Sequence, residues 1–179
     1  MNLAIKGLPN VVEINGSLFS IHTDFRAWMR FENEVARMGR DDKIDVSYLF
    51  KGDMPYQCSV YDLFSFSRPR SELPRHKGHS WVISLDYEID SDYIYAAFLS
   101  QYGIDLVDVE HLHWHKFLAL VKGLKEDEVI RKIMSYRNYE KTDSKKDIYM
   151  ELRRAWEIDR MTEEEKEELE EFMRIFDGV

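Results

Sequence analysis

Cysteine is almost absent from this chain of 179 residues, in which Cys58 is the sole thiol. One thiol cannot form an intramolecular disulfide, and it cannot supply the several cysteines of a structural zinc site. A lone cysteine is usually a small core residue, and nothing in the sequence around Cys58 marks a thiol nucleophile. GxSxG elbows, P-loops and dinucleotide fingerprints are also missing. The sequence therefore predicts a protein that is not an enzyme and holds no cofactor.

Long apolar runs are missing as well, so no segment is expected to cross a bilayer. The N-terminal residues MNLAIKGLPN lack the apolar core of a signal peptide, and we expect a protein of the cytoplasm. An excess of basic charge is absent too: the net charge is −9. Residues 161–179 carry eight acidic and two basic residues, a local net charge of −6. Such acidity disfavours binding to nucleic acid over a broad surface.

Helical periodicity dominates what is present. In residues 11–22, β-branched and apolar residues flank Asn15-Gly16, which is typical of a hairpin with a type I′ turn. Thr23 or Asp24 is then expected to cap a helix that ends at Gly39. Residues 44–66 indicate a short helix and a second segment that is either helix or strand.

Further along the chain, residues 67–80 contain two prolines and a local charge of about +3, which predicts a solvated loop. An anion contact is the alternative there. From residue 81 we expect helices from Asp90 or Ser91 to Gly103, and over 109–122, 126–137, 144–158 and 162–176. The predicted fold is mainly α: a single-domain helical bundle spanning residues 1–179, with a small N-terminal β-hairpin.

Three histidines at alternate positions, His111, His113 and His115, are the most conspicuous chemical pattern. The apolar spacing around them favours a helix capped by Asp108. On a helix His111 and His115 share a face, whereas His113 points about 200° away. The pair has the spacing of metalloprotease ligands, but no glutamate lies between its members. We interpret these histidines as polar or boundary residues of an amphipathic helix.

A metal-binding module or a metal-dependent enzyme remains the alternative for the pair. His111 and His115 would need a third ligand, such as His22, His76 or an acidic residue.

The last predicted helix is the better candidate for binding a partner. A Thr162-x-x-Glu165 capping box opens it, and its apolar side chains recur at helical spacing. Packing on its own domain is one use for this stripe, and docking on a partner or on a second copy is the other. The candidate partner-binding residues are Leu169, Phe172, Met173 and Phe176.

One set of residues resembles a known family. The set comprises Ile94, Tyr95, Ala97, Phe98, Tyr102-Gly103-Ile104-Asp105-Leu106, Leu112-His113-Trp114, Phe117, Leu120 and Gly123-Leu124. It is similar to small proteins of tailed phages and prophages of Gram-positive bacteria, whose genes lie in the tail module beside that of the tape measure protein. The similarity covers most of the chain and is clearest over residues 90–137. His115 departs from it, since an aromatic residue is expected there.

The resemblance implies a role like that of a tail assembly chaperone. Such a protein binds the tape measure protein, a long helical polymer, until tube subunits assemble around it. The tail tube protein is a further implied partner, and self-association along the target is plausible for a protein that binds in many copies. A structural component retained in the tail is the alternative within the same family. The resemblance carries over no catalytic or ligand-binding residues.

Overall fold

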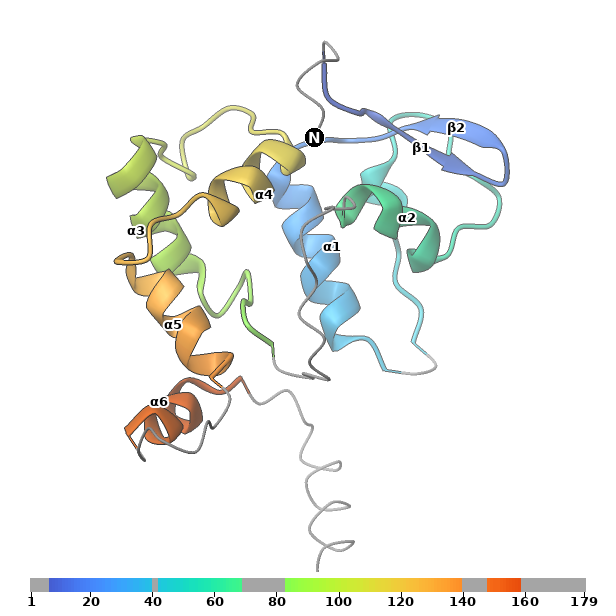
Figure 1. Ribbon diagram of the computed structural model, residues 1–179. Coiled ribbons are helices and arrows are strands. Elements are labelled where there is room, and N and C mark those ends of the chain that lie inside the picture. The colour runs from blue at the N-terminus through green and yellow to red at the C-terminus, as the bar shows by residue number, and fades with distance from the viewer. Residues whose placement is uncertain (1–6, 40–41, 69–82, 140–147, 159–179) are drawn as a thin grey trace, which may run out of the picture.

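The computed structural model describes residues 7–39, 42–68, 83–139 and 148–158. Within these ranges the protein is mainly α-helical, with one two-stranded antiparallel sheet near the N-terminus, as predicted (Figure 1). The elements in chain order are β1 (Val11–Ile14), β2 (Ser17–Ser20), α1 (Phe25–Arg37), the 3-10 helix η1 (Ser47–Leu49), α2 (Val60–Ser67), α3 (Ser91–Tyr102), α4 (Trp114–Lys122), α5 (Val129–Arg137) and α6 (Ile148–Trp156).

The hairpin confirms the prediction made from Asn15-Gly16. Asn15 has φ 52° and Gly16 has φ 78°, the positive values that a type I′ turn requires. The register pairs Val11 with Ser20 and Ile14 with Ser17. Successive side chains of a strand point to opposite faces, and in β1 Val12 and Ile14 are buried as part of the hydrophobic core.

Helix α1 is the central helix, and Asp24 caps it as predicted. The Asp24 side chain accepts a hydrogen bond from the backbone N–H of Arg26 at 3.1 Å. Phe25, Trp28 and Phe31 form its buried face. The regular helix ends at Arg37, two residues before the predicted Gly39.

The second segment predicted within residues 44–66 is the helix α2, so the alternative prediction of a strand there is wrong. Ser59 and Asp62 form a reciprocal capping box at the start of α2, in which Ser59 N–H donates to Asp62 Oδ2 at 2.8 Å. The short helix expected before it is only the 3-10 turn η1.

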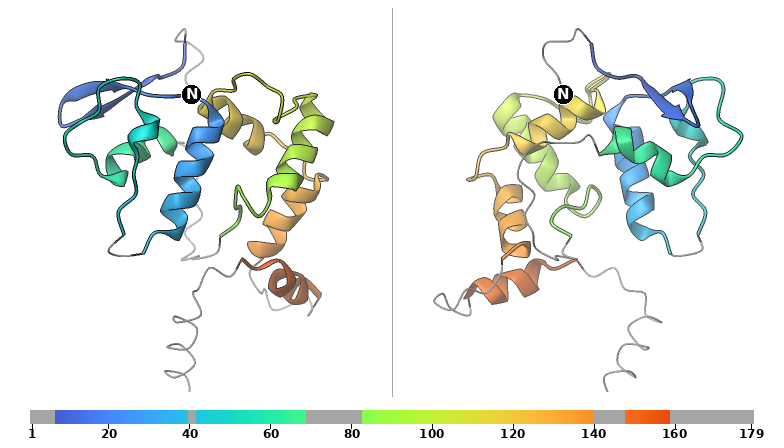
Figure 2. Two further views of the ribbon diagram at one scale, coloured as in Figure 1. Left: turned by 180° about the vertical axis from the view of Figure 1, so that it is seen from behind. Right: turned by 45° about the vertical axis from the view of Figure 1, so that its right-hand side comes forward.

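Aromatic rings fill the core between α1, α3 and α4. Phe117 of α4 stacks on Phe25 of α1 and on Phe98 of α3, with both pairs of ring centroids 5.1 Å apart. Trp114 adds a third stacked ring at 5.5 Å from Phe117. Offset stacking contributes about 0.5–1.5 kcal/mol per pair beyond burial of area. These contacts join the first helix to the second half of the chain, and Figure 2 shows α4 between α1 and α3.

The predicted C-terminal half is correct in its order of helices and wrong in several helix starts. Helix α3 follows Asp90 and ends at Gly103, which has φ 64°, as predicted. Helix α4 begins at Trp114 and not at residue 109, and α5 begins at Val129 and not at 126. The predicted helix over 162–176 and nearly all of the predicted loop over 67–80 lie outside the described residues.

Candidate functional site

Contacts of the backbone just before α4 explain why this helix starts at Trp114 and not at residue 109. His113, just before the first residue of α4, forms an antiparallel β-bridge with Asp24, just before the first residue of α1. Phe25 N–H donates to the Leu112 carbonyl at 2.9 Å, and Trp114 N–H donates to the Thr23 carbonyl at 2.7 Å. This pairing holds His113 at φ −61° and ψ 135°, so His113 and not Asp108 caps the helix. The predicted arrangement of His111 and His115 on one helical face is therefore wrong.

Each imidazole contacts a different segment of the chain. His111 is exposed, and its Nε2 lies 3.1 Å from Thr23 Oγ1. His113 Nε2 donates to the Pro9 carbonyl at 2.9 Å, while its Nδ1 accepts from His115 N–H at 3.0 Å. His115 Nε2 donates to the Phe66 carbonyl at 2.8 Å. The two buried histidines thus connect the start of α4 by hydrogen bonds to the N-terminal segment and to α2.

Burial lowers the pKa of both His113 and His115, despite the opposing effect of their hydrogen bonds to carbonyl oxygens. These rings are therefore neutral near pH 7, with the proton on Nε2. Among the described residues no group of three or more His, Cys, Asp or Glu side chains is arranged to hold a metal ion. His22, one proposed third ligand, is exposed near the start of α1, and His76 lies outside the described residues.

Cys58 is half-buried in the segment before α2. Burial raises the pKa of its thiol, and the nearby carboxylate of Asp62 adds to the effect. A raised pKa leaves less thiolate at neutral pH, which is the opposite of what a nucleophilic cysteine needs.

A buried ion pair between Arg137 and Asp90 is the most constrained polar cluster that the structure describes. Both side chains are almost fully buried, with 2% and 1% exposed. The guanidinium binds the carboxylate in bidentate fashion, with Nη1–Oδ2 at 2.6 Å and Nη2–Oδ1 at 2.9 Å. Its Nε donates to the Trp156 carbonyl at 2.7 Å, and Nη1 also reaches the Ser84 carbonyl at 3.3 Å. One arginine therefore joins α5, the segment before α3 and the end of α6.

The sequence predicts Asp90 only as the start of a helix and predicts no role for Arg137. A signal was present, because Ile130, Ile133 and Arg137 follow one another at the spacing of a buried helical face. A charged residue at such a position needs a buried partner.

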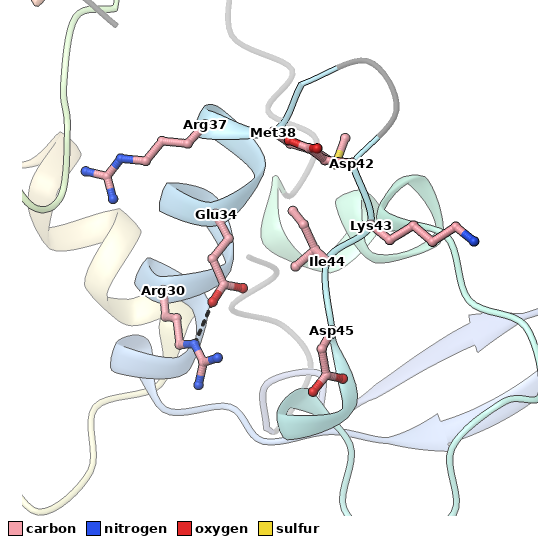
Figure 3. Close-up of a pocket in the computed structure, with 8 residues that line it drawn as sticks. All are labelled: Arg30, Glu34, Arg37, Met38, Asp42, Lys43, Ile44 and Asp45. Carbon is pink, nitrogen blue, oxygen red and sulfur yellow. Dashed lines mark hydrogen bonds and ion pairs between the residues drawn. The ribbon is translucent and has the colours of Figure 1, made fainter. Parts of the chain in front are cut away.

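A hollow of about 440 Å³ lies between the last turns of α1 and the segment that follows it (Figure 3). Arg30 and Glu34 within it already form an ion pair at 2.7 Å. Arg37 is paired with Glu88 outside it at 2.6 Å. Acidic and basic side chains are equally numerous in its lining, so its charge favours neither anions nor cations. The lining residues are Arg30, Glu34, Arg37, Met38, Asp42, Lys43, Ile44 and Asp45.

The residues predicted to bind a partner, Leu169, Phe172, Met173 and Phe176, lie outside the described residues. Of the basic segment 67–80, only Ser67 and Arg68 are described. The Arg68 guanidinium donates to Glu32 at 2.9 Å and lies over the Phe64 ring, so it is used within the fold. The described part of that segment thus offers no free basic group to an anion.

Comparison with known families decides which class of protein this is. Residues 62–158, more than half of the chain, match the model of the family described as Bacteriophage Gp15 protein. The chain belongs to this family. The matched segment runs from α2 to just beyond α6, so it contains the histidines and both members of the Asp90–Arg137 pair. The phage origin implied by the resemblance is confirmed.

No curated protein and no solved structure matches the chain significantly. None of the helices within the described ranges is long and apolar enough to span a membrane.

Proposed function

We propose that this phage protein is a tail assembly chaperone that binds the tape measure protein without catalysing a reaction. It acts in the cytoplasm of the bacterial host, where it covers apolar stripes of the tape measure protein until the tail tube assembles. Two lines of support come from the chain itself. Its family is a bacteriophage family, and the residues quoted over 90–137 resemble tail-module proteins encoded beside the tape measure protein.

The observation that carries the proposal is the exposure of apolar side chains within the family-matched segment. Helix α6 is amphipathic, yet none of its residues is buried. Ile148 is 61% exposed and Tyr149 is 43% exposed. Val107, in the loop after α3, is 75% exposed. A helix with so little apolar burial marks a region where the apolar stripe of another helix can bind reversibly.

The polar clusters support a binding role and not a chemical one. His113 and His115 donate their ring N–H groups to backbone carbonyls, and Arg137 uses its guanidinium to hold helices together. These groups are occupied in stabilising the fold. The chemistry we propose is therefore capture and release by apolar contact, with many copies of the protein on each tape measure chain. Contact with the tail tube protein and contact between neighbouring copies are part of this proposal.

The proposal is tested by expressing the tape measure protein of the same phage with and without this protein. We expect the tape measure protein to be insoluble alone and soluble in the presence of the chaperone. Equal solubility in both cases would contradict the proposal. Mass spectrometry of purified particles provides the second readout. A chaperone is absent from mature virions, whereas a stoichiometric amount in the virion would assign the protein to the tail structure instead.

A further inference from the structure

Helix α6 lies at the edge of the molecule. It crosses the end of α5, away from the core that α1, α3 and α4 share, and all views of Figures 1 and 2 agree on this position. Its apolar residues Met150, Leu152 and Trp156 are only partly covered, and Ile148 and Tyr149 are 61% and 43% exposed. Since none of its side chains is buried, apolar burial holds α6 only weakly.

The surface beneath α6 makes specific polar and aromatic contacts with it. It consists of Tyr93 of α3, Arg137 of α5 and Tyr139 after α5, which we call the α6 cradle. Arg137 is fixed by its two bonds to Asp90, and this leaves Nε directed at the Trp156 carbonyl, 2.7 Å away. A cationic donor at this place complements the unpaired carbonyls and the negative dipole end of a helix C-terminus.

Aromatic contacts complete the cradle. The Tyr93 ring meets the ring of Trp156 edge-on, with centroids 5.9 Å apart. The Tyr139 ring stacks on Tyr149 at 5.2 Å. The Tyr139 carbonyl accepts a hydrogen bond from Arg153 at 2.9 Å. The guanidinium and the Tyr93 ring thus contact the last turn of α6, and the Tyr139 ring contacts its first turn, so the α6 cradle fits one short amphipathic helix.

We propose that the α6 cradle is the docking surface for an amphipathic helix of the partner, and that α6 occupies this surface in the free protein as an internal competitor. Binding would then require α6 to leave and the partner helix to take its place on Tyr93, Arg137 and Tyr139. The identity of the partner helix rests on the proposed function, in which it belongs to the tape measure protein. The exchange keeps the cradle covered until the correct partner is present.

The exchange is tested first with a fluorescently labelled peptide of residues 144–160, whose sequence contains that of α6. Its binding to the full chain is measured by fluorescence anisotropy. In the Trp156→Ala variant the internal helix loses its ring contact with Tyr93 and competes less well. We expect this variant to bind the peptide about tenfold more tightly than the unaltered chain does. The matched control is Glu151→Ala, an exposed position on the same helix, which should bind the peptide as the unaltered chain does.

A second variant weakens the attachment of α6 at a different contact, so the test does not depend on the folding of Trp156→Ala alone. Tyr149→Ala removes the stacking on Tyr139 at the other end of α6 and should also strengthen peptide binding. Adding Tyr93→Ala to Trp156→Ala should remove the gain, because the cradle then lacks a ring. Circular dichroism spectra check that each variant is folded. Peptide binding of equal strength in the unaltered chain and in both folded single variants would overturn the proposal. So would tight binding that persists in the Tyr93→Ala double variant.

The same variants are then tested with the tape measure protein. If the proposed partner is wrong, neither the unaltered chain nor Trp156→Ala captures it, while the peptide still distinguishes the two. If the exchange is wrong and the partner is right, the unaltered chain captures the tape measure protein and Trp156→Ala captures it no better. The two failures therefore give different results.

Discussion

The buried pair between Asp90 and Arg137 leads to a quantitative prediction about stability. Replacing Arg137 by Met removes the guanidinium and leaves the Asp90 carboxylate at 1% exposure. The carboxylate then keeps the hydrogen bond from Asp86 N–H, at 2.9 Å, but has lost its cationic partner. Breaking a buried pair in this way costs about 3–5 kcal/mol. For a chain of this size, that lowers the melting temperature by about 6–20 °C.

The double variant Asp90→Asn with Arg137→Met isolates the interaction energy between the two side chains from their contacts with other residues. It buries no charge, so its loss of stability should be much smaller than the sum of the two single losses. We expect a coupling free energy of at least about 2 kcal/mol. Urea denaturation followed by tryptophan fluorescence gives the free energy of unfolding of all four proteins in the cycle.

The ion pair between Arg37 and Glu88 is a matched control, because its N–O distance of 2.6 Å is the same. Its side chains are 48% and 62% exposed, so solvent screens the interaction. Arg37→Met should therefore cost less than about 1 kcal/mol. Equal losses in the free energy of unfolding for Arg37→Met and Arg137→Met would contradict this prediction. Additive losses for Asp90→Asn and Arg137→Met, with no coupling free energy, would contradict it as well.

Three further predictions concern the fold. Burial lowers the pKa of His113 and His115 below that of histidine in an unfolded chain, about 6.5, so their contribution to stability is fully present above that pH and is lost as the pH falls below it. Urea denaturation at several pH values should show this loss of stability at low pH. The pH dependence should be smaller in a variant in which both histidines are replaced by glutamine. Phe117→Ala, in the fully buried stack, should lower the free energy of unfolding by about 3–5 kcal/mol in the same assay, and a loss below about 1 kcal/mol would contradict the packing. Gly103→Ala forces a side chain into the left-handed conformation at φ 64° and should cost about 1–2 kcal/mol, whereas unchanged stability would argue against this helix end.

The sequence predicted those features that are determined by neighbouring residues. Asn15-Gly16 produces the hairpin turn by its own backbone preferences. Asp24 caps α1, and Gly103 ends α3, through bonds to residues a few positions away. The mainly helical fold follows from the same local signals.

The predictions that failed depend on contacts distant in sequence. Asp108 has the chemistry of a helix cap, but backbone pairing of Leu112 and Trp114 with the start of α1 keeps the chain extended as far as His113. The roles of the histidines could not be predicted for the same reason, because their carbonyl partners lie in other segments. Arg137 was missed because its partner Asp90 is 47 positions away, although its place on an apolar helical face was a usable signal.

The proposed binding of this protein to the tape measure protein is tested by the molar mass of a co-purified complex. The two proteins are expressed together, purified through a tag on the tape measure protein, and analysed by size-exclusion chromatography with light scattering. We predict one complex whose mass corresponds to several copies of this chain on each tape measure protein. A tape measure protein that elutes without this chain, at expression levels where both are soluble, would contradict the account.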